Sequence, residues 1–138
     1  VLAHTPIEPL NDDAVEAWGH RAVISTLAAF GGTPSTVANL AAFRESGALI
    51  LYGTDLGNTR QPGIQVRELE LLLAAGLTGP EIVAAGTSTP ARFWQLTDLG
   101  RIEIGATASL LLLRENPHLN PLTLAAPTGV IIAGKTRL

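Results

Sequence analysis

Short apolar runs and longer amphipathic stretches alternate along the first hundred residues. The runs have the composition of strands buried in a parallel sheet, and they lie at 1–4, 22–26 and 48–52. The stretches between them, 11–18 and 33–47, carry apolar residues at helical spacing. Asn11 and Thr33 fit the N-cap positions of two helices, and Pro34 fits the first helical position. The pattern therefore predicts strand, helix, strand, helix, strand.

Three further helices are predicted at 66–75, 78–86 and 89–96. The second has a capping-box pattern, because Glu81 follows Thr78 by three residues. Beyond residue 100 the spacing of apolar residues changes from that of helices to that of β-strands. Apolar and polar residues alternate at 101–105, and apolar strands are predicted at 108–113 and 129–133, with a turn-rich loop at 116–121 between them. A small β unit is therefore expected after the helices.

The spacing of the predicted strand ends suggests a repeated βα unit. The strands end at His4, about Thr26, and Asp55, which are 22 and 29 residues apart. A (β/α)8 barrel uses roughly 30 residues per unit. A doubly wound parallel sheet gives similar spacing, so periodicity alone leaves both folds open.

The length of the chain limits how much of a barrel it can form. It has 138 residues, whereas a complete barrel uses roughly 250. The apolar fraction of 46% is high, yet no apolar run approaches the ~18 residues of a membrane span. We expect part of a larger core, from a longer or processed gene product, since the sequence also contains no methionine.

Charge and composition exclude some function classes. The net charge is −3 and Lys and Arg form no cluster, which disfavours a nucleic-acid partner. The absence of cysteine removes disulfides and thiolate metal sites, and it permits the cytoplasmic location that we expect. We therefore expect a small-molecule substrate, without a nucleic-acid or membrane partner.

Two polar residues follow buried strands directly and are the first candidates for chemistry. His4 and Asp55 both lie where loops after parallel strands build functional sites. A carboxylate and an imidazole suit a divalent metal and proton transfer from water. The same residues equally fit a polar cluster without metal, and Asp55 fits a turn former. Asn58, Thr59 and Arg60 fit either substrate contacts or a solvated loop.

An ordered series of segments resembles the amidohydrolase superfamily, in its imidazolonepropionase-like and prolidase-like branch. It comprises Leu51-Tyr52-Gly53-Thr54-Asp55, Arg67 to Leu72, Gly76-Leu77-Thr78, Ile82 to Ala85, Thr89-Pro90-Ala91, and Leu99 to Ala108. The resemblance implies an α/β fold, in which residues 1–100 form about the last three strands of a TIM barrel. Residues 101–138 would form part of the accompanying β-sandwich.

The resemblance also assigns roles to the candidates. Asp55 corresponds to the aspartate that ends the eighth barrel strand, so it is expected to bind the metal and shuttle a proton. His4 resembles the histidine that ends the sixth strand, as a metal ligand or a substrate contact. Asn58 and Thr59 are expected substrate contacts. The implied cofactor is a divalent metal, zinc in first place, as one or two ions.

The rest of the family's ligand set has no counterpart in this sequence. Its His-x-His pair, its bridging Lys or Glu and a further histidine are absent. Catalytic zinc normally takes three protein ligands, so the chain by itself is expected to be inactive. Ala108-Ser109 also replaces the family's Ala-Asp, far from the expected site.

Two function classes follow from these patterns. In the first, the complete protein hydrolyses C–N bonds of small amides, cyclic amides or dipeptide-like substrates with a metal-activated water. In the second, the chain is a non-catalytic α/β module that pairs with another chain or with a copy of itself through open strand edges. A flavodoxin-like binding domain ranks third, because no phosphate-binding loop is present.

Overall fold

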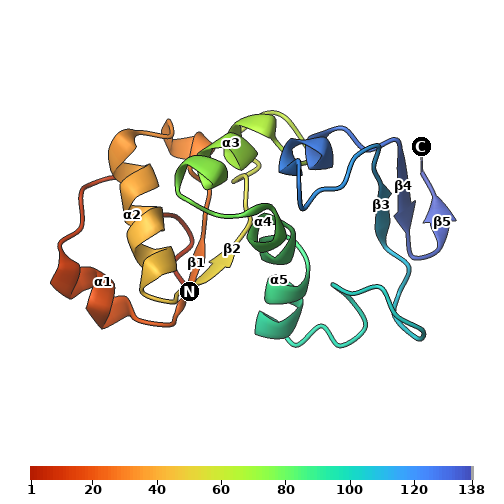
Figure 1. Ribbon diagram of the computed structural model, residues 1–138, viewed down its shortest axis with the longest axis horizontal. Coiled ribbons are helices and arrows are strands. Elements are labelled where there is room, and N and C mark those ends of the chain that lie inside the picture. Colours follow the sequence, from red (N-terminus) through yellow and green to blue (C-terminus); the bar gives the residue numbers. More distant parts are fainter. Residues whose placement is uncertain (138) are drawn as a thin grey trace.

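The computed structural model describes residues 1–137 and begins with a small parallel sheet. Strand β1 (Ala22–Ile24) pairs in parallel with β2 (Leu49–Leu51), in the register Val23 to Ile50. Leu2 adds a parallel bridge to Val23 on the other side of β1. Helices α1 (Asp12–Trp18) and α2 (Pro34–Glu45) connect the three segments (Figure 1). The predicted alternation of strands and helices is thus confirmed.

Side-chain caps begin the predicted helices at the expected places. The Asn11 side chain accepts a hydrogen bond from the backbone N–H of Ala14, and the Thr33 hydroxyl accepts one from Thr36. Pro34 occupies the first turn of α2, where its missing N–H costs nothing. Strands β1 and β2 are shorter than predicted, at three residues each, because only Ala22–Ile24 and Leu49–Leu51 pair with one another, and the segment predicted at 1–4 forms a single bridge at Leu2.

Three helices pack against the sheet and continue the core. They are α3 (Val66–Ala74), α4 (Gly79–Ala85) and α5 (Ser88–Phe93). The capping box at the start of α4 is present in full, between Thr78 and Glu81. One apolar cluster joins the sheet to α2, α3 and α4; it includes Val23, Leu27, Leu40, Phe43, Ile50, Leu69, Leu72 and Ile82.

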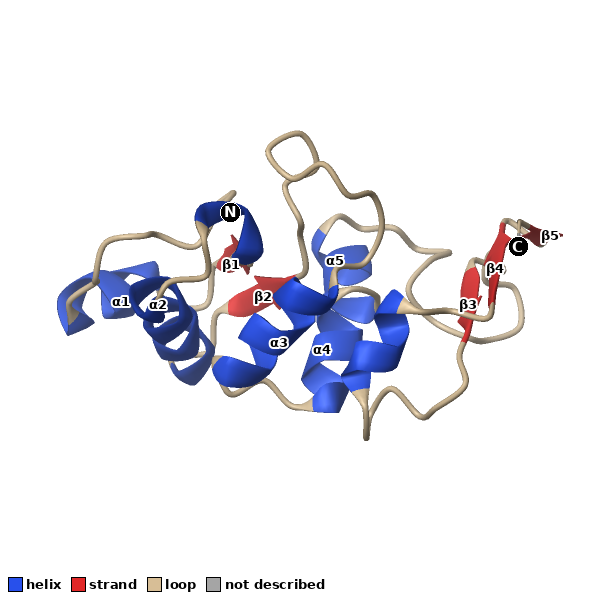
Figure 2. Cartoon of the chain, turned by 90° about the horizontal axis from the view of Figure 1, so that it is seen from above, coloured by secondary structure: helices blue, strands red, loops and turns tan. Residues whose placement is uncertain are grey.

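An antiparallel meander lies at the other end of the molecule. Its strands are β3 (Leu110–Leu112), β4 (Gly129–Ile132) and β5 (Lys135–Thr136), hydrogen-bonded in that order. Figure 2 shows this sheet beyond the helices, at the end of the molecule opposite α1. Two 3-10 turns that the sequence pattern did not predict, η1 (Ala28–Phe30) and η2 (Pro121–Ala125), complete the fold. Within residues 1–137, no helix has both the length and the apolar character needed to cross a membrane.

The extended segment predicted at 101–105 is wrong. These residues form bends and turns, and Ile102 and Ile104 are 88% and 105% exposed. Arg101 hydrogen-bonds to the Thr97 carbonyl and to the Glu103 carboxylate, which folds the segment back on itself. Alternating side chains predict a strand only where a neighbouring strand accepts the backbone hydrogen bonds, and none does here among the described residues.

Candidate functional site

The carboxyl ends of the three parallel segments lie along one edge, which we call the strand-end edge. His4 follows the segment at Leu2, Ser25 and Thr26 follow β1, and Asp55 follows β2. Neighbouring strands lie about 4.8 Å apart, so the first and third strand ends are separated by roughly 10 Å of sheet. The two predicted chemical residues therefore share an edge, with the end of β1 between them.

Asp55 is the centre of a tight turn. Its carbonyl accepts hydrogen bonds from the N–H groups of Asn58 and Thr59, both at 3.1 Å. Its carboxylate Oδ2 accepts one from the Asn58 side-chain amide at 2.6 Å, and the Thr59 hydroxyl donates to the Thr54 carbonyl at 2.8 Å. The structure thus brings Asp55, Asn58 and Thr59 together in one turn.

His4 is exposed, and its contacts come from the β1 end. Its Nδ1 lies 3.0 Å from the Thr26 hydroxyl oxygen. Its ring centroid lies 4.7 Å from that of Phe30 in η1, with the ring planes tilted by 56°. In the described part of the chain, His4 makes no hydrogen bond to Asp55.

Of the four residues other than glycine that have a positive φ in the described structure, two lie at this edge, and the other two, Gln95 and Ala133, lie elsewhere. Thr26 and Asp55 have φ values of 46° and 52°, in the left-handed region that residues other than glycine rarely adopt. For a β-branched residue such as Thr26 this conformation is costly, and such strain is often found at functional sites. Gly53 lies against the end of β1, because a Cβ there would come within 2.4 Å of the Ile24 Cγ2 atom and 3.2 Å of the Thr26 Cγ2 atom. The two strand ends are packed too closely for a side chain at Gly53.

Glu68 lies beneath the edge and was not singled out from the sequence. Its side chain on α3 is fully buried, at 0% exposure. The N–H groups of Leu27 and Ala28 donate to its carboxylate at 3.0 and 2.7 Å. Burial raises the pKa of Glu68, and the hydrogen bonds from Ala28, Ser25 and Leu27 oppose that rise. A signal was available: this charged residue sits at helical spacing among the apolar residues of α3 that face the core.

Tyr52 joins the edge to the start of α3. Its hydroxyl oxygen accepts a hydrogen bond from the Gln65 N–H at 2.9 Å, which takes the place of a side-chain cap at that helix. Burial raises the pKa of the Tyr52 hydroxyl, the Gln65 hydrogen bond lowers it, and the nearby Glu68 charge raises it further. A polar layer beneath the strand ends therefore connects α3 to both strands.

Asn39 of α2 is a second buried polar residue that the sequence pattern did not reveal. Its amide nitrogen donates to the carbonyls of Pro6 and Glu8, at 2.9 and 2.8 Å. Its amide oxygen accepts from the Leu10 N–H at 3.0 Å. These three hydrogen bonds hold the loop that follows His4 against α2.

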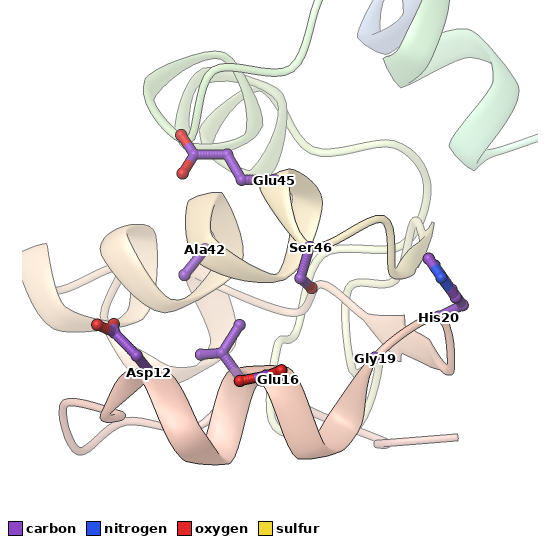
Figure 3. Close-up of a pocket in the computed structure, with 8 residues that line it drawn as sticks. Asp12, Glu16, Gly19, His20, Ala42, Glu45 and Ser46 are labelled. Carbon is purple, nitrogen blue, oxygen red and sulfur yellow. The ribbon is translucent and has the colours of Figure 1, made fainter.

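The other two histidines lie away from the strand-end edge. His20 precedes β1, and its Nδ1 lies 3.2 Å from the Gly47 carbonyl oxygen. An open pocket of about 480 Å³ between α1 and α2 is lined by His20 together with Asp12, Glu16 and Glu45. Figure 3 shows these side chains. His118 is exposed in the loop before η2. None of the predicted site residues lines the pocket of Figure 3.

The donor atoms at the strand-end edge are too few to hold a metal ion by themselves. Across residues 1–137, no three His, Asp or Glu side chains gather closely enough to hold a metal ion. His4 and Asp55 offer one imidazole and one carboxylate, which are suitable ligand types for zinc. A catalytic zinc takes about three protein ligands, so this chain can supply only some of them.

Comparisons with known proteins identify what the chain is similar to. Residues 27–137 match the model of the family described as "Amidohydrolase family". Uncharacterized proteins of Mycobacterium tuberculosis and Mycobacterium bovis are each 35% identical over 99 residues, which cover 70% of this chain and 25% of theirs. The chain therefore spans about a quarter of the length of these curated relatives.

Solved structures share the fold. A protein described as a proposed prolidase from Bifidobacterium longum is 28% identical, with a TM-score of 0.76 over 97% of this chain and 41% of its own. A Xaa-Pro dipeptidase solved with bound methionine is 20% identical, with a TM-score of 0.72 over 83% of this chain and 34% of its own. A structure titled as an amidohydrolase is 21% identical, with a TM-score of 0.72 over 94% of this chain and 38% of its own.

Proposed function

This chain belongs to the amidohydrolase family, and from that membership we propose that the complete protein hydrolyses C–N bonds of small amides, cyclic amides or dipeptide-like substrates. The observation that carries the proposal is the Asp55 carboxylate, which lies at the strand-end edge within the segment that matches the family. The proposed prolidase, at 28% identity, supports dipeptide-like substrates.

In this proposal the chain contributes the C-terminal part of the protein. Residues 1–100 are the last strands and helices of a TIM barrel, and residues 101–138 are part of a β-sandwich beside it, of which residue 138 lies outside the described residues. The parallel order of Leu2, β1 and β2 and the separate meander β3 to β5 support this division. The protein is proposed to be cytoplasmic.

Asp55 is the proposed metal ligand and proton shuttle. A bound divalent cation, zinc as one or two ions, would supply Lewis-acid activation of water. Asp55 would hold the cation with one carboxylate oxygen and accept the proton of the attacking water, which it then delivers to the leaving nitrogen. The Asn58 amide already bonds to Oδ2 and fixes the carboxylate plane, as partners of metal ligands do.

His4, Asn58 and Thr59 are proposed to complete this part of the site. The second nitrogen of His4, Nε2, is the atom available to a metal or to substrate, because Nδ1 faces the Thr26 hydroxyl. Asn58 and Thr59 border Asp55 and are proposed substrate contacts. The remaining metal ligands are proposed to lie outside these residues.

Association with the rest of the barrel, or with a second copy, belongs to the same proposal. Large apolar side chains such as Leu49, Trp94 and Ile104 are exposed on the described surface. Open strand edges and exposed apolar side chains favour association. The shortage of metal ligands also keeps a non-catalytic assembly module as the second candidate.

Metal removal from the full-length protein tests the function. The protein is assayed with Xaa-Pro dipeptides, other dipeptides and small cyclic amides, before and after dialysis against a chelator. We expect turnover of at least one substrate, its loss with the metal, and its recovery when zinc or another divalent cation is returned. Undiminished turnover in protein that mass spectrometry shows to be metal-free would contradict the proposal. A folded protein that binds no metal and cleaves none of these substrates would favour the assembly module.

A further inference from the structure

One buried carboxylate holds the segment that follows β1. Glu68 reaches from α3 to the N–H groups of Leu27 and Ala28, at 3.0 and 2.7 Å. These N–H groups begin η1, and Leu27 at its N-cap makes no side-chain cap of its own. The Glu68 carboxylate on α3 therefore caps η1, although Glu68 lies 40 residues after Ala28 in the sequence.

Both contacts of His4 belong to the segment that Glu68 holds. The Thr26 hydroxyl, 3.0 Å from Nδ1 of His4, is on the residue directly before Leu27. Phe30, whose ring lies against the His4 ring, ends η1. A shift of this segment would move the hydrogen-bond partner and the ring contact of His4 together.

The chemistry of the contact requires a carboxylate. Two adjacent N–H groups point at the side chain, and each carboxylate oxygen accepts one of them. A glutamine has a single acceptor oxygen and would turn its NH2 group toward the other N–H. The burial of a charged group is costly, so a residue that served packing alone would be apolar at this position.

We propose that Glu68 is a positioning residue, which fixes the segment from Ser25 to Phe30 and through it the orientation of the His4 imidazole at the strand-end edge. The inference rests on the proposed function and deepens it, because it gives the imidazole of His4, a proposed ligand or substrate contact, a defined orientation. The positioning role of Glu68 is the same whether His4 binds the metal or the substrate.

The test measures the chemical reactivity of each histidine in the full-length protein. Diethyl pyrocarbonate modifies exposed imidazoles, and mass spectrometry of peptides gives a separate rate for His4, His20 and His118. The variant Glu68→Gln is compared with Glu70→Gln, an identical change at an exposed position on the same helix, whose partner Arg67 lies 3.5 Å away. Circular dichroism checks that each variant is folded.

We expect Glu68→Gln to raise the rate at His4 several-fold and to leave His20 and His118 unchanged, because neither contacts this segment. Glu70→Gln should leave all three rates unchanged. Phe30→Leu, which removes the ring contact without touching Glu68, should raise the rate at His4 alone.

An unchanged His4 rate in folded Glu68→Gln would overturn the inference, as would an equal rise at all three histidines, which indicates general loosening. If Glu68→Gln does not fold, an unchanged His4 rate in Phe30→Leu overturns it. The readout needs no turnover, so failure of this inference is distinct from failure of the proposed hydrolase activity.

Discussion

The geometry of the Asp55 turn makes compatible two roles that a sequence pattern presents as alternatives, a turn former and a reactive carboxylate. The residue forms a turn, because its carbonyl accepts two backbone hydrogen bonds, and its carboxylate still lies at the strand-end edge. The carboxylate is fixed by one partner, Asn58, at 2.6 Å. The geometry of Asp55 therefore depends on Asn58 whether or not Asn58 also contacts substrate.

Replacement of Asn58 tests its two proposed roles, which are to hold the Asp55 carboxylate and to contact the substrate. In Asn58→Ala the Asp55 carboxylate loses its hydrogen bond, and loss of such a partner typically costs about ten- to a hundred-fold. We expect this loss in kcat, together with a rise in KM from the lost substrate contact, in steady-state assays of the full-length protein. A rise in KM alone would restrict Asn58 to substrate binding, and a fall in kcat alone would restrict it to holding the Asp55 carboxylate. Gln61→Ala, an exposed change in the same loop, is the matched control and should leave both constants unchanged.

At the scale of single residues, the sequence pattern predicted the polar residues that follow strands but not the polar residues buried in the helices that pack beside the strand ends. Asp55 and His4 were recognisable because each ends an apolar run. Glu68 was visible as a charged residue among the core-facing apolar positions of α3, but the partners of Glu68 and Asn39 were not, since their hydrogen bonds reach residues 41 and 33 positions away. Contacts of that range depend on how the helices pack, which local periodicity does not contain.

At the scale of helices and strands, the helix caps are the features that the local sequence determines most directly. The start of α4 combines the Thr78 and Glu81 capping box with an ion pair, in which Arg44 of α2 donates to both Glu81 oxygens at 3.0 and 3.1 Å. Burial raises the pKa of Glu81, but hydrogen bonds from Thr78 and Arg44 outweigh it and the pKa is lowered. One side chain thus begins α4 and ties it to α2.

We expect Glu81→Ala to lower the free energy of unfolding by about 1–2 kcal/mol at neutral pH, where a cap is worth about 1 and a partly exposed ion pair less. The folded-state pKa of Glu81 lies below its ordinary value of 4.5. Its contribution is therefore complete above that value and is lost as the pH falls through the lowered pKa.

Urea unfolding of the wild-type protein and the variant, repeated at decreasing pH, checks this expectation. Glu70→Ala removes an exposed pair with Arg67 on α3 and should cost at most about 0.5 kcal/mol. A Glu81→Ala difference that stays constant into the acid range would show that the charge of Glu81 contributes nothing.

Element types were easier to predict from the sequence than pairing. The helices at 34–45, 66–74 and 79–85 follow caps and apolar periods that are visible locally. The segment at 101–105 had the alternation of a strand but has no neighbouring strand to pair with in the described structure. Strand formation requires a partner, and sequence alternation alone does not provide one.

At the scale of the whole molecule, close backbone contact joins the helices to the loop before η2. A Cβ at Gly79, the first residue of α4, would come within 2.1 Å of the His118 carbonyl oxygen. The helix η2 also packs against α3 and α4. The loop therefore sits directly on the helical part, and no side chain longer than that of glycine fits at Gly79.

The family membership and the fold explain why the chain supplies only part of a site. It spans a quarter of its curated relatives and about two fifths of the solved structures. A barrel site draws residues from the ends of several strands, and this chain provides three parallel segments. The central claim is that one of those ends, at Asp55, handles the proton of C–N hydrolysis.

The most direct test of that claim is the turnover of Asp55→Asn in the full-length protein. Asparagine tolerates the left-handed backbone at this position and matches the shape of aspartate, so the fold should be kept. We predict a fall in kcat of about a hundred- to ten-thousand-fold, while Asp13→Asn, an exposed control in α1, stays at the wild-type rate. Wild-type turnover in folded Asp55→Asn would contradict the account.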